Sequence, residues 1–229
     1  MAELCFFGHS FFKLSLGSAN ILIDPFITTD SMAKHGMEKL IDCRVAKEQL
    51  KNINLILLTH EHFDHFDKAS VEELASKNNA CVIAHEGILN ELNLSRGQLV
   101  PAKIGSTVNS RSVSVEVFPA HHPSSFYPVG YLVKGKGCTV FHAGDTALMD
   151  EFEQLKPDIA LLPIGGGTTM DCVDAVKATK VMKPRVAIPM HYNTFDCIKA
   201  DPQEFKARIE KSNLKTKAVI LKPGQKYRL

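Results

Sequence analysis

A short apolar segment that runs into three histidines and an aspartate constrains the fold of this chain more than any other feature. Residues 54–58 have the composition of a buried strand, and the spacing that follows is His60-x-His62-x-Asp64-His65. Imidazole nitrogens bind Zn²⁺ and similar ions at about 2.0–2.1 Å, and alternate residues of an extended segment point to the same side. His60 and His62 can therefore bind one ion, while Asp64 and His65, beyond a turn, face a second point close by. The spacing predicts a loop that holds two metal ions.

A loop that is merely rich in histidine is the simplest alternative to a metal site. The tract, however, follows a predicted strand and precedes a predicted helix that begins after Asp67. Functional loops are commonly found between such elements. We therefore interpret the tract as a metal site.

Further segments of the chain match short motifs of a known family. They are Gly8-His9, Ile23-Asp24-Pro25-Phe26, His142-Ala143-Gly144-Asp145-Thr146, Pro163-Ile164-Gly165-Gly166 and Pro189-Met190-His191-Tyr192-Asn193-Thr194-Phe195. With the histidine tract, they resemble the metallo-β-lactamase superfamily and, within it, small metal-dependent hydrolases similar to the ascorbate-phosphate lactonases. The resemblance covers nearly the whole chain. Glu61 and Phe63 depart from it, because many relatives have glycine at one or both spacers, so either these side chains point away from the metals or the site is altered.

The order of the expected elements predicts an α+β fold. Strands are expected at 4–7, 11–16, 19–24, 54–58, 81–84, 112–119, 128–133, 138–142, 159–163, 186–190 and 218–221. Helices are expected at 32–39, 46–51, 68–77, 85–92, 146–155, 171–182 and 202–212. Strands followed by helices, twice over, predict two sheets packed face to face with helices outside. The resemblance implies the same four-layer αββα sandwich.

The composition is that of an ordinary globular protein, with 45% hydrophobic and 23% charged residues among 229. A formal charge of +2 gives no reason to expect a nucleic-acid partner or an anionic membrane. The chain contains neither a bilayer-spanning apolar run nor a signal-peptide pattern at its start. Its six cysteines form no C-x-x-C pair, which favours reduced thiols. We expect a cytoplasmic protein with a single domain over residues 1–229 and a small-molecule substrate, compatible with a homo-oligomer.

Three further strand ends carry side chains that can bind metal. The adjacent His121 and His122, then Asp145, and then His191 each follow a predicted strand. Because strand ends deliver side chains to a common cleft, we expect one of the two adjacent histidines, Asp145 and His191 to join the tract. Singly, each would be better explained as a hydrogen-bonded structural residue. It is their combination with the tract that indicates a site.

The resemblance assigns these residues to two ions. One ion would be bound by His60, His62 and His122, the second by Asp64, His65 and His191, and Asp145 would bridge both. His122 is preferred over His121 because it matches the Pro-Ala-x-His pattern of the family. Asp24 is a candidate to orient a ligating histidine, His142 is expected to be a core residue, and His9 has no assigned role.

The site residues favour hydrolysis by a metal-bound hydroxide. Asp64 is the predicted catalytic residue, as a ligand that can also carry a proton. Zn²⁺ is the first choice of metal, with Mn²⁺, Fe²⁺ and Ni²⁺ as alternatives. No serine lies in a nucleophile-elbow motif, so no covalent intermediate is expected. The competing hypotheses are a di-iron oxidoreductase, a nuclease and a non-catalytic metal-binding protein of the same fold.

Overall fold

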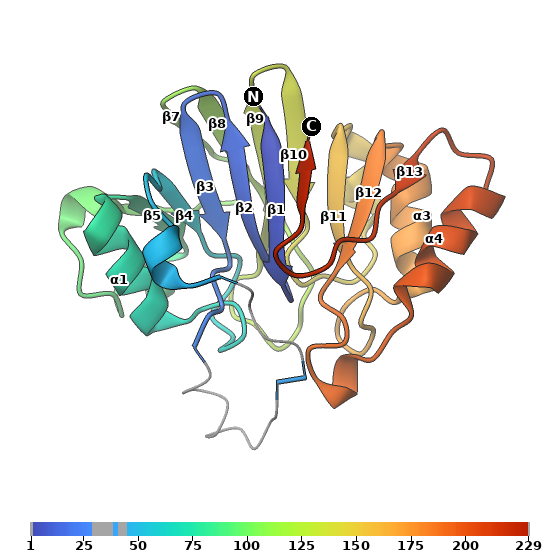
Figure 1. The fold of residues 1–229 in the computed structure, drawn as a ribbon, viewed down its shortest axis with the longest axis horizontal. Helices are drawn as coiled ribbons and strands as arrows, with labels where there is room; N and C mark the ends of the chain where they lie inside the picture. Colours follow the sequence, from blue (N-terminus) through green and yellow to red (C-terminus); the bar gives the residue numbers. More distant parts are fainter. Residues whose placement is uncertain (1, 29–38, 41–44, 229) are drawn as a thin grey trace.

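Two seven-stranded mixed sheets form the centre of the protein, as described by a computed structural model for residues 2–28, 39–40 and 45–228 (Figure 1). In order across the first sheet, the strands are β14 (Lys226–Arg228), β1 (Glu3–Gly8), β2 (Phe11–Leu16), β3 (Ala19–Ile23), β4 (Leu55–Leu57), β5 (Cys81–Ala84) and β6 (Leu99–Pro101). In the second sheet they are β13 (Lys217–Ala218), β12 (Val186–Met190), β11 (Ile159–Pro163), β10 (Cys138–His142), β9 (Val129–Gly135), β8 (Val113–Pro119) and β7 (Thr107–Ser110).

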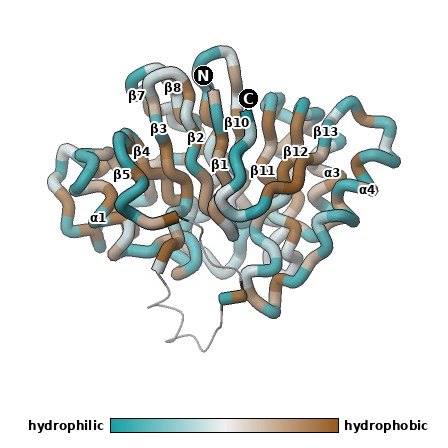
Figure 2. The backbone as a smooth tube through the Cα atoms, viewed as in Figure 1, coloured by the Kyte–Doolittle hydropathy of each residue, from teal (hydrophilic) through white to brown (hydrophobic). Residues whose placement is uncertain are grey.

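Strand β4 shows why its segment reads as continuously apolar. Leu55 and Leu57 belong to the large buried cluster that includes residues of both sheets, whereas Ile56 and Leu58 belong to a second cluster with side chains of helix α1 (Lys68–Asn78). Successive side chains of a strand point to opposite faces, and both faces are covered here. The tube coloured by hydropathy shows the apolar strands gathered at the centre of the molecule (Figure 2).

Helices flank the sheets, with α1 beside β4 and β5 and, on the other side of the molecule, α3 (Cys172–Met182) and α4 (Pro202–Lys211) beside β12 and β13 (Figure 1). Each begins at an aspartate whose carboxylate accepts backbone N–H groups of the first turn: Asp67, Asp171 and Asp201. Such a cap is worth about 1 kcal/mol. The short helix α2 (Glu86–Leu89) follows β5, capped by His85. The predicted αββα arrangement of two sheets with outer helices is confirmed.

Several predicted elements were wrong or incomplete. The helix expected at 146–155 is only a 3₁₀ turn, Asp150–Gln154, because the start of this segment bonds to other loops: Ala147 N–H donates to the His121 carbonyl, and the Thr146 carbonyl accepts from Met170 N–H. The segments 46–51 and 85–92 contain only Lys47–Gln49, in a 3₁₀ turn, and α2. The strand predicted at 218–221 is only β13, Lys217–Ala218. Strands β6, β7 and β14 were not predicted. Most of the predicted helix 32–39, and His35, lie outside the described residues.

Candidate metal centre

Six strands deliver the residues of the site from their carboxyl ends. In the first sheet β1 and β3 are both antiparallel to β2, and β4 is parallel to β3, so these three strands run the same way. In the second sheet β8 and β10 are both antiparallel to β9, and β12 runs parallel to β10 through β11. The residues that follow these six strand ends are His9, Asp24, the tract from His60 to His65, His122, Asp145 and His191.

Three of these residues have a left-handed backbone. The φ angles are +56° at His9, +48° at Asp24 and +53° at His191. Residues other than glycine adopt this region uncommonly, although Asp and His do so more readily than most. The strain costs on the order of 1–3 kcal/mol per residue and is typical of functional sites. The fold therefore accepts strained turns in order to direct these side chains to one place.

Two glycines let the loops approach the site closely. A side chain at Gly144, whose φ is +62°, would place its Cβ 2.7 Å from the Val129 carbonyl oxygen. A Cβ at Gly165 would collide with the His191 carbonyl oxygen. Within the 165–167 run, close backbone approach is thus required at Gly165 alone, because a Cβ would meet only an ordinary contact at Gly166 and nothing at Gly167.

One group of possible ligands, which we call the three-histidine cluster, consists of His60, His62 and His122. The nearest of their nitrogens, His62 Nδ1 and His122 Nε2, are 3.1 Å apart. His60 and His122 are buried, and His62 is partly exposed. The structure places the neighbouring His121 at the surface. Three imidazole nitrogens that converge in this way form a site typical of zinc.

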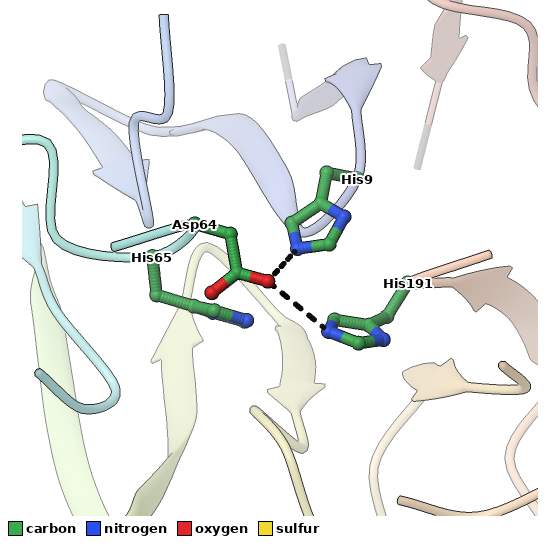
Figure 3. A group of neighbouring side chains, drawn as sticks. All are labelled: His9, Asp64, His65 and His191. Atoms are coloured by element: carbon green, nitrogen blue, oxygen red, sulfur yellow. Dashed lines mark hydrogen bonds and ion pairs between the residues drawn. The ribbon is translucent and has the colours of Figure 1, made fainter. Parts of the chain in front are cut away.

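A second group, the carboxylate cluster, consists of His9, Asp64, His65 and His191. His9 Nε2 lies 3.2 Å from Asp64 Oδ2, and His191 Nε2 lies 3.9 Å from the same oxygen. Figure 3 shows the two rings approaching this oxygen from one side, with the ring of His65 below the carboxylate. His9 is the member to which the sequence assigned no role, although Gly8-His9 was visible at a strand end.

Asp145 lies between the clusters. Its Oδ2 is 3.8 Å from His122 Nε2 and 3.9 Å from His60 Nε2, and only 3.0 Å from His191 Nε2. Its Oδ1 is 3.3 Å from His65 Nε2. A carboxylate with histidines of both clusters around it can serve both, as expected of a bridging ligand.

Hydrogen bonds to the outer ring nitrogens leave the inner ones available. Buried Asp24 accepts from His65 Nδ1 at 2.7 Å and from Thr59 Oγ1 at 2.7 Å. Because Thr59 donates its only hydroxyl proton to Asp24, it must accept from His60 Nδ1, which is 3.0 Å away. The His122 Nδ1 donates to the Thr168 carbonyl oxygen at 3.2 Å. Partners of this kind fix the tautomer and orientation of metal-binding histidines, and Asp24 has the predicted orienting role.

Four buried ligand atoms at the centre make no hydrogen bond among the described residues: His60 Nε2, His65 Nε2, Asp145 Oδ1 and His191 Nε2. The nitrogens of His65 and His191 lie within ion-pair distance of Asp145, but without the geometry of a hydrogen bond. Unpaired buried polar groups are rare in proteins and call for an explanation such as an ion. Nitrogen and oxygen donors of this kind suit divalent metal ions. The residues present therefore fit a metal centre, while the assignment of individual ligands stays a prediction.

The charges of the metal-free site follow from burial and close contacts. Burial lowers the pKa of His60 and of His122, so these rings are neutral at neutral pH. Burial alone would lower the pKa of His65 too, but the carboxylates of Asp145 and Asp24 raise it well above its ordinary value. Burial would raise the pKa of Asp145, but the neighbouring His191 and His65 hold it well below its usual range.

The two side chains at the spacer positions contact groups outside the candidate ligand set. Glu61 accepts from Ser125 Oγ at 2.8 Å and from Phe126 N–H at 3.0 Å, and so fixes the loop beyond His122. The ring of Phe63 packs against Phe26, with centroids 6.3 Å apart, yet it also lines the cavity beside the site.

The remaining histidines of the described region have structural contacts. His142 is buried, with Nε2 donating to the Ser10 carbonyl oxygen at 3.0 Å and Nδ1 accepting from Gly144 N–H at 3.2 Å. It is the core residue that the sequence suggested. His85 caps α2 and stacks on Tyr127.

A cavity of about 330 Å³ opens onto the site. Its lining combines site residues with polar and apolar neighbours: His62, Phe63, Asp64, His122, Ser124, Asp145, Thr168, His191, Phe195, Cys197 and Ile198. Its size is in the range of small-molecule pockets. Within the described ranges, no helix has the length and apolar character to cross a membrane.

Known proteins resemble this chain over nearly its whole length. The family model described as "Beta-lactamase superfamily domain" matches residues 3–191. A "UPF0173 metal-dependent hydrolase" of Aeropyrum pernix is 37% identical, over 99% of this chain and 97% of the relative. One of Staphylothermus marinus is 39% identical, over 99% of both chains. A solved metallo hydrolase of Ignicoccus hospitalis, Igni18, is 31% identical with a TM-score of 0.81, covering 100% of this chain and 98% of the other.

The narrower likeness to ascorbate-phosphate lactonases stays a prediction. Membership of the broader family is established, because identities of this size extend over 97% or more of both sequences and coincide with a shared fold. On these grounds the chain belongs to the metallo-β-lactamase superfamily, as one of its UPF0173 metal-dependent hydrolases.

Proposed function

We propose that this metal-dependent hydrolase cleaves an ester, lactone or phosphoester bond of a small metabolite, using two divalent ions and forming no covalent enzyme intermediate. The observation that carries the proposal is the set of unpaired buried ligand atoms beside an open cavity. When bound, a pair of divalent ions supplies a water molecule of lowered pKa and positive charge that stabilises the transition state. Zn²⁺ is the first candidate, given the three-histidine cluster.

Asp64 is the residue best placed to move a proton. Its side chain lines the cavity, and its Oδ2 lies 3.2 Å from His9 Nε2. Burial would raise the pKa of Asp64, but the hydrogen bond from His9 and the nearby His65 hold it below its usual range. The carboxylate is therefore ionised, so it can accept a hydrogen bond from the nucleophile, and from this position it can carry a proton to the leaving group.

One serine needs a separate test, because its contact was not expected. Ser124 Oγ lies 3.2 Å from His122 Nε2, the geometry of a hydroxyl beside a base. The same nitrogen lies 3.1 Å from His62 Nδ1, inside the three-histidine cluster. A nitrogen whose lone pair binds a cation cannot also serve as a base, so we assign Ser124 no nucleophilic role.

The decisive experiment is hydrolysis in ¹⁸O-water by protein that has been stripped of metal and reloaded with Zn²⁺, Mn²⁺, Fe²⁺ or Ni²⁺. Lactones, neutral esters and phosphoesters are the panel. Label should enter the product in a single turnover. Asp64→Asn should lower kcat by about 10²–10⁴ while the melting temperature is kept. Ser124→Ala should stay within about tenfold of the parent, since removal of a nucleophile would cost far more. A covalent adduct at Ser124, or full activity after chelation, would contradict the proposal.

A further inference from the structure

We infer that Phe63, Phe195 and Ile198 form an apolar wall that binds the hydrocarbon part of an uncharged substrate, so that the enzyme acts on neutral esters or lactones rather than on phosphorylated compounds. The inference rests on the proposed function and narrows its substrate class. All three side chains line the cavity that opens onto the site. Together with Phe26 they form a separate apolar cluster, outside the two large cores.

The wall is held in place before any substrate arrives. The ring of Phe63 lies 6.0 Å from that of Phe195, and Phe26 lies behind both, with centroids 6.3 and 6.4 Å away. These are the separations of favourable aromatic pairs. Phe195 and Ile198 are largely buried despite lining the cavity. A surface that is already ordered loses little conformational freedom on binding, which favours affinity for an apolar group.

The wall lies on one side of the site only. The ring of Phe195 packs edge-on against His9 of the carboxylate cluster, with centroids 5.6 Å apart, and the ring of Phe26 behind the wall lies 5.8 Å from the same histidine. The lining beside the three-histidine cluster is polar, with Ser124 and Thr168 in contact with His122. A substrate would therefore lie with its hydrocarbon part beside the carboxylate cluster and its polar part toward the three-histidine cluster.

The charges around the cavity do not favour a phosphate group. Among the described residues that line the cavity, none is a lysine or an arginine. The lysine at position 39 has its Nζ 4.0 Å from the centre of the Phe26 ring, and neither residue lines the cavity. The carboxylates that line it, Asp64 and Asp145, are candidate metal ligands. Phosphate sites in proteins are usually built with arginine or lysine donors, so only the metal ions would attract a phosphate group here, and the apolar wall is the feature that favours an uncharged substrate.

Binding of straight-chain carboxylates, from acetate to octanoate, to the metal-loaded protein tests the wall without turnover. The dissociation constant should fall about threefold to fourfold for each methylene group that the wall buries. Phe63→Ala should reduce the gain in affinity per methylene group, and Phe63→Leu should give a gain between those of the parent and of Phe63→Ala. Metal content is measured for each variant, because position 63 lies between two site residues. Phe126→Ala is the matched control, since this ring is 57% exposed and does not line the cavity.

A second arm compares 4-nitrophenyl butyrate with 4-nitrophenyl phosphate, which share a leaving group. The inference expects kcat/KM to favour the butyrate by at least tenfold, and Phe63→Ala to reduce that preference. A flat carboxylate series, an equal loss of slope in Phe126→Ala, or preference for the phosphate would overturn the inference. If no compound is hydrolysed by any metal form, the proposed function fails, while the carboxylate series still decides whether the wall binds hydrocarbon.

Discussion

The two halves of the metal centre are built differently, although they lie side by side. The three-histidine cluster offers nitrogen donors only, and two of its rings are held by Thr59 and by the Thr168 carbonyl. The carboxylate cluster includes Asp64, and its His65 is held by the buried carboxylate of Asp24. One half thus offers only imidazole nitrogens, and the other adds a carboxylate oxygen and is supported by a buried charge.

This difference should show in the metals that each half accepts. Imidazole suits Zn²⁺, Fe²⁺ and Ni²⁺, whereas carboxylates suit harder ions such as Mn²⁺. The three-histidine cluster should therefore discriminate more strongly in favour of zinc. Asp145, with Oδ2 near histidines of both halves, is the predicted link between the two sites.

The largest effect is expected from Asp145→Asn, because it removes the charge that both halves share. Its cost in metal affinity should exceed the roughly 10- to 100-fold that loss of a supporting contact costs, and it should affect both ions. Metal retained after gel filtration, measured by mass spectrometry, should fall from two equivalents towards none. Loss of only one equivalent would show that Asp145 belongs to one half.

A one-sided loss is expected from His122→Ala, which removes a donor from the three-histidine cluster alone. Metal content should fall by about one equivalent, because three protein donors are the usual minimum of a catalytic zinc site. His121→Ala is the matched control, since His121 is exposed and lies outside the cluster. The reverse order of effects would refute the assignment of His122.

Asp24→Asn tests the supporting contacts. Asp24 belongs to none of the candidate ligand groups among the described residues, yet it accepts hydrogen bonds from His65 and from Thr59, which orients His60. Metal affinity should fall about 10- to 100-fold. The fall should be larger at the carboxylate cluster, because Asp24 contacts the His65 ring of that cluster directly. Competition with a chromophoric chelator measures both affinities. Equal affinities in variant and parent would remove Asp24 from the account.

The smallest expected effect is the release of one proton when the metal binds. In the metal-free protein the neighbouring carboxylates raise the pKa of His65 well above its ordinary value, so at pH 7.5 the ring is protonated and must lose that proton to bind an ion. Affinity for the carboxylate cluster should therefore rise with pH until the pKa of His65 is passed. The rings of His60 and His122, with lowered pKa, release none. Calorimetry in buffers of different ionisation enthalpy counts the protons, and Asp24→Asn should reduce the release.

The sequence predicted those parts of the fold that depend on local patterns. The caps Asp67, Asp171 and Asp201 could be read because an aspartate before an apolar periodic run has a local physical meaning. The segment 146–149 could not, because its hydrogen bonds go to loops that are remote in sequence. Edge strands such as β7 and β14 are short and partly exposed, so they lack an apolar pattern.

The same distinction holds within the site. The histidine tract was visible because its spacing is contained in six residues. His9 was visible at a strand end, but its contact with Asp64 spans 55 positions and depends on a left-handed turn. The wall of Phe63, Phe195 and Ile198 likewise joins segments more than 130 residues apart. Such contacts come from the meeting of strand ends, which no single segment encodes.

Anomalous diffraction from crystals of the metal-loaded protein, recorded at the absorption edge of the bound metal, tests the central claim most directly. Two half-sites that share Asp145 predict two anomalous peaks about 3.5–4 Å apart, one beside His60, His62 and His122 and the other beside Asp64, His65 and His191. A single peak at full loading, with His191 unbound, would contradict the account.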